Sequence, residues 1–374
     1  MSCFKIEKSS GASRAGWLRC EHGGIPTPTF MPVGTLGAVK TLESRELEQL
    51  GAKIILSNAY HLYLRPGVEI LKQSGGLHCF MNWHGPILVD SGGFQVFSLN
   101  GLRKVTDEGV QFQSHIDGSF HLFTPEKVVN IQRAIGADFM MPLDDLVGYP
   151  VDENAADKAA QRTWNWLLRG MEEFEKTEPL YGYRQILPPI VQGSFIPHLR
   201  RREAERLANL EAPFYAIGGL AVGEEPEQTK EAIEISLEYL PLESAKYCMG
   251  IGLPHDLLDA ISLGIDLFDC VIPTRNGRNA TLFTLKGRMN LRNAKYATDQ
   301  LPVEENCQCP LCMNYSRAYL HHLFNAKEIL GLKLASVHNL YFYFQLMKSA
   351  REHILEQDYT NWARLIRDDL ANKI

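Results

Sequence analysis

The chain has 374 residues, a formal net charge of −6 and 45% hydrophobic residues. This length is sufficient for one large core with an appended subdomain. No segment approaches the roughly 20 continuous apolar residues of a membrane span, and residues 1–8 lack the apolar core of a secretory signal. We therefore expect a cytoplasmic protein without a membrane partner. The negative charge excludes a general attraction to nucleic acid, so any such attraction must be local.

The predicted elements repeat one order along the chain. Residues 1–35 are short strands and turns rich in Gly and Pro. An amphipathic helix, a glycine, a short apolar strand and a polar residue then follow one another at 42–58, 125–145 and 255–269. Further apolar runs occur at 86–89, 189–191, 214–217 and 246–249, with helices predicted over 152–176, 198–209 and 226–239.

About seven or eight apolar strands that alternate with helices predict an α/β fold, a (β/α)8 TIM barrel. The functional residues of such a barrel lie at the C-terminal ends of its strands. An open doubly wound sheet is the alternative fold. The chain has no Gly-x-Gly-x-x-Gly after its first strand to favour that alternative.

Two strands end in a carboxylate, Asp90 and Asp269, and a carboxylate can attack an electron-poor carbon. Arg275 and Arg278 follow Asp269 on a predicted loop and can bind phosphates or base edges. No acidic residue occurs between Asp269 and Asp299. That interval forms a local cationic strip of Arg275, Arg278, Lys286, Arg288, Arg292 and Lys295. The run at 200–202 is predicted to be a solvated helix face.

A cysteine cluster is the most specific local motif. Cys307-Gln-Cys309-Pro-Leu-Cys312 is followed by His338. Three thiolates and one imidazole complete a tetrahedral zinc shell and leave no position for water or substrate. The pattern predicts one structural Zn²⁺ per subunit. The fourth ligand stays open at this point, because two histidines, at 321 and 322, lie nearer to the cysteines.

Several motifs occur in a characteristic order: Asp90-Ser-Gly-Gly-Phe-Gln, Ala216-Ile-Gly-Gly-Leu-Ala-Val-Gly-Glu, Phe268-Asp-Cys-Val-Ile-Pro-Thr-Arg-Asn-Gly-Arg, and the cysteine cluster with its later histidine. Together they resemble tRNA-guanine transglycosylase, also called queuine tRNA-ribosyltransferase, over nearly the whole chain. The resemblance implies a barrel over 1–300, a zinc subdomain over 301–345 and C-terminal helices over 346–374. It also implies a homodimer.

The resemblance implies an exchange of the guanine at the tRNA wobble position for a 7-deazaguanine. Asp269 matches the nucleophile and Asp90 the general acid/base, which together make a covalent ribosyl-enzyme, as in retaining glycosidases. Asn58 is expected to orient Asp90. The implied base-binding positions are Asp90, Phe94, Asp144, Leu146, Gln192, Gly219, Leu220 and Met249. The implied contacts with the tRNA anticodon loop are Gly250, Gly252, Thr274, Arg275, Arg278 and Lys286.

Two positions depart from the familiar bacterial pattern. Phe94 replaces a tyrosine, and Leu143-Asp-Asp-Leu146 replaces Phe-Asp-Glu-Cys. The second change resembles the eukaryotic catalytic subunit, so we expect queuine to be accepted in addition to, or in preference to, the cationic precursor preQ1.

Three alternatives remain open from the sequence. Core packing is the alternative role for Phe94 and Met249, and also for the aromatic stripe 341–344, a candidate dimer interface. A zinc-bearing TIM-barrel glycoside hydrolase is the alternative enzyme, with water as the acceptor. A non-catalytic binding subunit is the third alternative, and the presence of both Asp90 and Asp269 argues against it.

Overall fold

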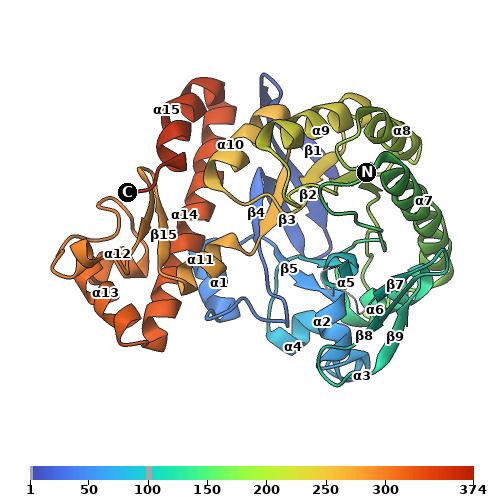
Figure 1. Cartoon of the computed structure of the whole chain (residues 1–374), viewed down its shortest axis with the longest axis horizontal. Helices are drawn as coiled ribbons and strands as arrows, with labels where there is room; N and C mark the ends of the chain where they lie inside the picture. The colour runs from blue at the N-terminus through green and yellow to red at the C-terminus, as the bar shows by residue number, and fades with distance from the viewer. Residues whose placement is uncertain (1–2, 98–102) are drawn as a thin grey trace.

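The computed structural model describes residues 3–97 and 103–374. Within these residues a ring of eight parallel strands surrounds the core (Figure 1). The strands are β4 (Thr29–Pro32), β5 (Ile55–Asn58), β6 (Ile87–Asp90), β10 (Phe139–Met140), β11 (Ile190–Val191), β12 (Phe214–Ile217), β13 (Ala245–Cys248) and β14 (Leu267–Cys270). The predicted (β/α)8 fold is confirmed.

The backbone ladder of this ring is divided between two parallel sheets. One sheet has the order β5-β6-β10 and the other the order β11-β12-β13-β14-β4. Single bridges join the sheets, between Val33 and Leu56 at one seam and between Phe139 and Ile186 at the other. The barrel is therefore a ring of strands without a continuous ladder.

The ring is enclosed by helices that connect successive strands (Figure 1). The larger ones are α6 (Pro125–Ile135), α7 (Glu153–Lys176), α8 (Pro197–Ala208), α9 (Pro226–Tyr239) and α10 (Pro254–Leu263), and α1 (Ser44–Leu50) is shorter. Helices α6 and α10 end at Gly136 and Gly264, which adopt the left-handed conformation at φ 78° and 105°. Glycine enters this conformation without a steric penalty, so these glycines stop the helices as the sequence predicts.

Residues at every second position of the strands fill the barrel, because side chains of a strand alternate between its faces. Leu88, Leu267 and Ile190 belong to one buried inner cluster. The same faces continue two residues later as Asp90, Asp269 and Gln192. The strand period therefore directs polar side chains to the C-terminal mouth of the barrel.

The other end of the barrel is closed by an antiparallel sheet of β1 (Phe4–Ser10), β2 (Ser13–Cys20) and β3 (Gly23–Thr27). Phe4, Leu18 and Ile25 from these strands pack into the inner cluster. Three short helices, α2 (Ala59–Leu64), α3 (Val68–Gln73) and α4 (Gly76–Met81), follow β5. The sheet of β7 (Arg103–Val105), β8 (Val110–Gln113) and β9 (Phe120–Phe123), which lies between β6 and α6 in the chain, was not predicted from the sequence.

The C-terminal region packs beside the barrel, at the red end of Figure 1. It contains α11 (Ile272–Arg278), the hairpin β15 (Thr281–Thr284) and β16 (Gly287–Asn290), the turn η1 (Ala294–Tyr296), α12 (Pro310–Asn314), α13 (Arg317–Asn325), α14 (Ile329–Glu356) and α15 (Tyr359–Ala371). The domain boundary predicted at residue 346 falls within α14. No helix in the described ranges combines the length and apolarity needed to cross a membrane.

The aromatic stripe at 341–344 packs mainly inside the protein. Phe342, Tyr343 and Phe344 are 4%, 0% and 8% exposed, and the Tyr343 hydroxyl donates to the Gly252 carbonyl at 2.5 Å. The stripe therefore serves the core, and its interpretation as a dimer interface is wrong. Only Tyr341 is partly exposed.

Candidate active site

Asp90 lies at the C-terminal end of β6 and accepts four hydrogen bonds. The Ala59 and Gly92 amides donate to Oδ1 at 3.1 Å each. The amides of Asn58 and Gln95 donate to Oδ2, the latter at 2.9 Å. Burial outweighs these donors and raises the pKa of Asp90 to about 6. A carboxyl with this pKa can release or accept a proton near neutral pH.

Asp269 lies at the end of β14. Its Oδ1 accepts from the Tyr247 hydroxyl at 2.6 Å and from the Gly250 amide at 3.0 Å. Within the described residues both donors bind this one oxygen, so the lone pairs of Oδ2 remain for an electrophile. Burial raises the pKa of Asp269 above its ordinary value. Burial raises the pKa of Tyr247 well above its ordinary value, and the negative charges of Asp269 and Asp90 raise it further.

Asp144 and Gln192 form a hydrogen-bonded pair beside Asp90. Gln192 Nε2 donates to Asp144 Oδ2 at 2.8 Å, and the Ser91 hydroxyl donates to Oδ1 at 3.1 Å. Burial raises the pKa of Asp144 to about 6. A Cβ on Gly219 would lie 2.5 Å from Gln192 Oε1, and the φ of Gly219 is +71°. Only glycine therefore fits next to this pair.

The apolar members of the predicted base site differ in exposure. Phe94 is 54% exposed at the start of α5 (Gly93–Phe97), which argues against core packing for this ring. Met249 is half-buried against the inner cluster, and its sulfur would lie 3.4 Å from a Cβ on Gly218. Leu220 and Leu146 are buried, at 5% and 7% exposure.

Arg275 and Arg278 lie on helix α11, so the prediction of a loop after β14 is wrong. Pro273 occupies the first turn of α11, where the missing N–H removes no hydrogen bond. Arg275 is exposed, and Thr274 is buried. Arg278 is partly buried, and its Nη1 has no hydrogen-bond acceptor among the described residues. Burial and the charge of Arg275 lower the pKa of Arg278.

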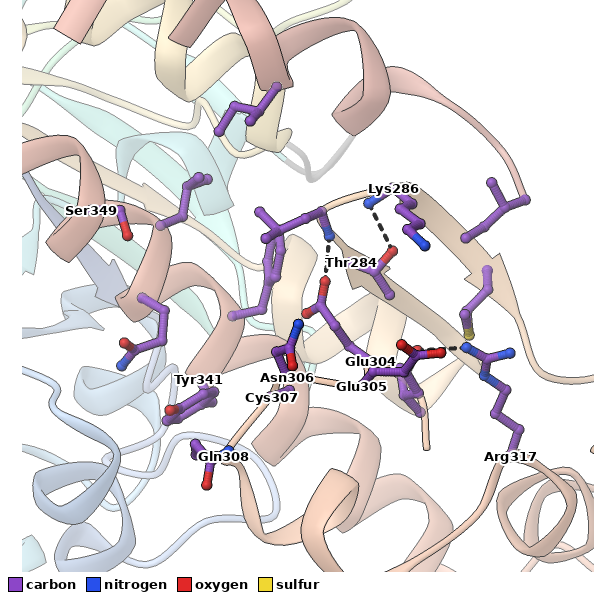
Figure 2. Close-up of a pocket in the computed structure, with 18 of the residues that line it drawn as sticks. Thr284, Lys286, Glu304, Glu305, Asn306, Cys307, Gln308, Arg317, Tyr341 and Ser349 are labelled. Carbon is purple, nitrogen blue, oxygen red and sulfur yellow. Dashed lines mark hydrogen bonds between the residues drawn. The ribbon is translucent and has the colours of Figure 1, made fainter. Parts of the chain in front are cut away.

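The two glycines of the predicted tRNA contact lie close to β14. Gly250 has a φ of +80° and donates to Asp269. A Cβ on Gly252 would lie 2.3 Å from the Cys270 Cβ. Lys286 lies apart from these residues, in the turn of the β15–β16 hairpin, where it lines a cavity of about 540 Å³ beside the cysteine cluster (Figure 2).

The cysteine cluster has the arrangement of a tetrahedral metal centre. The His338 Nδ1 lies 3.8, 3.4 and 3.4 Å from the sulfurs of Cys307, Cys309 and Cys312. Metal–sulfur and metal–nitrogen bonds of the lengths found in zinc sites place neighbouring ligands about 3.6 Å apart. His338 Nε2 lies 2.8 Å from the Phe283 carbonyl and therefore carries the hydrogen, which leaves Nδ1 as the ligand. The residues fit a closed structural metal site.

The alternative ligand at 321 is used elsewhere. Its Nδ1 lies 2.7 Å from the Leu291 carbonyl and its Nε2 lies 2.8 Å from the Asn325 amide. His338 sits within α14, one residue before Asn339. The Asn339 amide donates to the carbonyls of Pro273 and Thr281 at 2.9 and 3.0 Å. The metal centre is thus adjacent to the contact that fixes α11 and its arginines.

Comparison with known proteins identifies the family. The model of the family described as queuine tRNA-ribosyltransferase matches residues 9–372. The chain belongs to the queuine tRNA-ribosyltransferase family. It is an enzyme of the tRNA-guanine transglycosylase class.

Curated relatives of the same name support this membership. The queuine tRNA-ribosyltransferase of Thermoanaerobacter pseudethanolicus is 51% identical over 93% of this chain and 92% of the relative. That of Desulforamulus reducens is 48% identical over 94% of each chain. That of Thermodesulfovibrio yellowstonii is 46% identical over 96% of this chain and 93% of the relative.

Two site residues were missed in the sequence, and the exposure of one nearby arginine was predicted wrongly. Tyr247 lies on the inward face of β13, two residues before Met249, so the strand period could have found it. Gln95 lies one position after Phe94 in a motif already singled out, and it binds Asp90. Arg200 was predicted to be solvated but is 0% exposed, so that prediction is wrong.

Proposed function

We propose that this enzyme replaces the guanine at the wobble position of GUN anticodons with a 7-deazaguanine, as part of queuosine modification of tRNA. The observation that carries the proposal is the pair of partly buried carboxylates, Asp90 and Asp269, at the ends of β6 and β14. Asp269 accepts a hydrogen bond from Tyr247, and the Asp144–Gln192 pair adjoins Asp90 through Ser91.

In the first step the ionised Asp269 attacks C1′ of the ribose. The carboxylate–C1′ bond forms while the C1′–N9 bond breaks, and the bonding electrons leave with the purine. The Tyr247 and Gly250 donors hold Oδ1, so Oδ2 is directed at the carbon. Asp90, with its pKa near 6, supplies or removes the proton of the purine. The RNA strand stays intact on the enzyme.

In the second step the incoming base attacks the same C1′ and releases Asp269. Base recognition falls to Asp144, whose carboxylate accepts from the ring N–H and amino group, and to the Gln192 amide. The Gly219 N–H donates to the purine carbonyl. The exposed ring of Phe94 and the thioether of Met249 stack on the two faces of the base.

The tRNA is held by its anticodon loop with the target guanine turned out of the stack. Arg275 and Arg278 lie three positions apart on α11 and therefore share a face, from which they contact the bases beside the guanine. Zn²⁺ suits the Cys3His donor set and stabilises the region that carries α11. A homodimer is part of the proposal, with its interface outside the buried aromatic stripe.

Queuine is the proposed preferred base. The adjacent acid, Asp145, is 9% exposed and ion-paired with Arg162, so it offers little charge to a cationic aminomethyl group. Leu146 adds an apolar, buried side chain at this point. The pairing of Asp145 with Arg162 favours a substituent that depends less on a free carboxylate than the aminomethyl group of preQ1 does.

An exchange assay tests both parts of the proposal. The substrate is unmodified tRNA that carries labelled guanine at the wobble position. Incubated with unlabelled guanine, it should lose its label with the wild-type enzyme and retain it with Asp269→Asn. Queuine and preQ1 are then offered at equal concentration, and queuine should be incorporated faster. Retained exchange in Asp269→Asn contradicts the mechanism, whereas absence of queuine exchange contradicts only the base preference.

A further inference from the structure

Arg200 is a buried cation held by carbonyl oxygens. Its Nη1 donates to the carbonyls of Val191 and Gly218 at 3.0 Å each, and its Nη2 donates to the carbonyl of Ser194 at 2.7 Å. No carboxylate forms an ion pair with it in the described part of the chain. Burial lowers its pKa to about 10, which leaves the guanidinium charged at neutral pH. Burial of a charge without a bonded counter-ion is costly, and here the hydrogen bonds to three carbonyl oxygens offset part of that cost.

The carbonyl of Gly218 belongs to the same peptide unit as the Gly219 N–H. A charged donor on the oxygen of an amide withdraws electron density from its nitrogen, so the N–H becomes a stronger donor. No acceptor for the Gly219 N–H occurs within the ranges that the structure describes. Arg200 therefore polarises one peptide whose donor is unused in the protein alone.

The residues that follow Gly219 in the chain are also held in place. Glu224 accepts from the Ala221 and Val222 amides at 2.6 and 2.8 Å and from the Thr229 hydroxyl at 2.6 Å. Gln192 lies where a side chain on Gly219 would be placed. The Gly218–Gly219 peptide itself is oriented by the hydrogen bond from Arg200 to its carbonyl, so its dipole is set before any base arrives, which is the arrangement that makes fixed donors effective in catalysis.

We propose that Arg200 is a positioning residue that polarises the Gly218–Gly219 peptide and thereby stabilises the departing purine. The inference rests on the proposed function. When the C1′–N9 bond breaks, the electron pair enters the purine and part of the charge reaches its carbonyl oxygen. The Gly219 N–H meets that charge, and Arg200 strengthens the contact through the shared peptide. No proton moves to or from Arg200.

A purely structural role is the competing explanation, because Arg200 also joins the ends of β11 and β12. The two roles differ in their dependence on the purine carbonyl. A structural defect slows the reaction of every base equally. A defect in peptide polarisation slows most the base with the strongest carbonyl acceptor.

The test measures single-turnover release of the base from tRNA that carries guanine or 6-thioguanine at the wobble position, since sulfur is the weaker acceptor. The variants are Arg200→Gln and Arg200→Lys, with Arg201→Gln as the control because Arg201 is exposed on the same helix. We expect Arg200→Gln to slow release of guanine about 10-fold and release of 6-thioguanine much less, with tRNA affinity unchanged. Arg200→Lys retains the positive charge, so its rate of guanine release should lie between those of the wild type and Arg200→Gln.

Equal slowing of both bases, or an unchanged rate in a folded Arg200→Gln protein, would overturn the inference. Failure of both variants to fold would assign Arg200 to the fold and overturn it as well. Failure of the proposed function has a different signature. In that case the wild-type enzyme releases no guanine, or the Asp269→Asn variant releases it normally.

Discussion

Replacement of Asp144 by asparagine should stabilise the protein while it removes base binding. The pKa of Asp144 is raised from 3.8 to about 6 by burial. A carboxyl with a higher pKa in the folded state contributes stability below pH 3.8, and this contribution is lost as the pH rises through 6. The ionised Asp144 therefore destabilises the folded protein at neutral and alkaline pH.

A rise of about two pH units in the pKa of Asp144 destabilises the folded protein, relative to a protein without this shift, by about 3 kcal/mol at pH 8 and by about 1.5 kcal/mol at pH 5. Asparagine fits the same contacts, because its oxygen can accept from Gln192 and its amide can donate to the Ser91 hydroxyl. Asp144→Asn should thus raise the free energy of unfolding by about 3 kcal/mol at pH 8 and by about half as much at pH 5.

Urea denaturation of wild type and Asp144→Asn at both pH values measures this difference. The control is Asp368→Asn, since the Asp368 side chain is 90% exposed and its removal should change stability by less than about 0.5 kcal/mol. Guanine binding, measured by calorimetry, should be lost only in Asp144→Asn. A destabilised Asp144→Asn protein, or a stability gain independent of pH, would refute the claim that Asp144 is ionised at neutral pH at the expense of folding stability.

Three further predictions concern recognition and pH. Arg278→Ala should weaken tRNA binding about 10-fold in a filter assay and leave guanine affinity intact, since Arg278 is proposed to contact only the RNA; equal loss of both would indicate misfolding instead. Exchange should fall as the pH drops through 6, because Asp144 and Asp90 then become protonated; a flat rate between pH 5 and 8 would be inconsistent with their raised pKa values. Removal of the metal by a chelator should impair tRNA binding before guanine binding, because Asn339, next to the ligand His338, fixes α11; simultaneous loss of both would place the metal's effect on the barrel.

The alternation of strands and helices was predictable because it depends on local signals. Glycines such as Gly136 end the helices, and short apolar runs supply the strands, so the barrel follows from the order of elements. The sheet of β7–β9 was missed because its strands are short and lack a continuous apolar run. Helix α11 was missed because the residues that follow Asp269 were interpreted as a loop, whereas Pro273 stands in the first turn of a helix, where proline is common.

Site residues could be predicted where a local pattern in the sequence reveals them, and not where only packing in the folded chain does. The three cysteines lie within six positions, so the sequence shows them together, but only packing decides that His338 is the fourth member. Arg200 was assigned to the surface from its charge. Yet it shares a helix face with the buried Ala204 and Leu207, at spacings of four and seven residues. Helical period was therefore the better guide to its burial than residue type.

The covalent intermediate is the central claim, and it can be measured directly. Enzyme and unmodified tRNA are mixed, denatured rapidly and separated on a denaturing gel. We expect an RNA–protein adduct in the wild type that disappears on addition of guanine before denaturation, and none in Asp269→Asn. An adduct that persists in Asp269→Asn, or exchange without any adduct in the wild type, would contradict the assignment of Asp269 as the nucleophile.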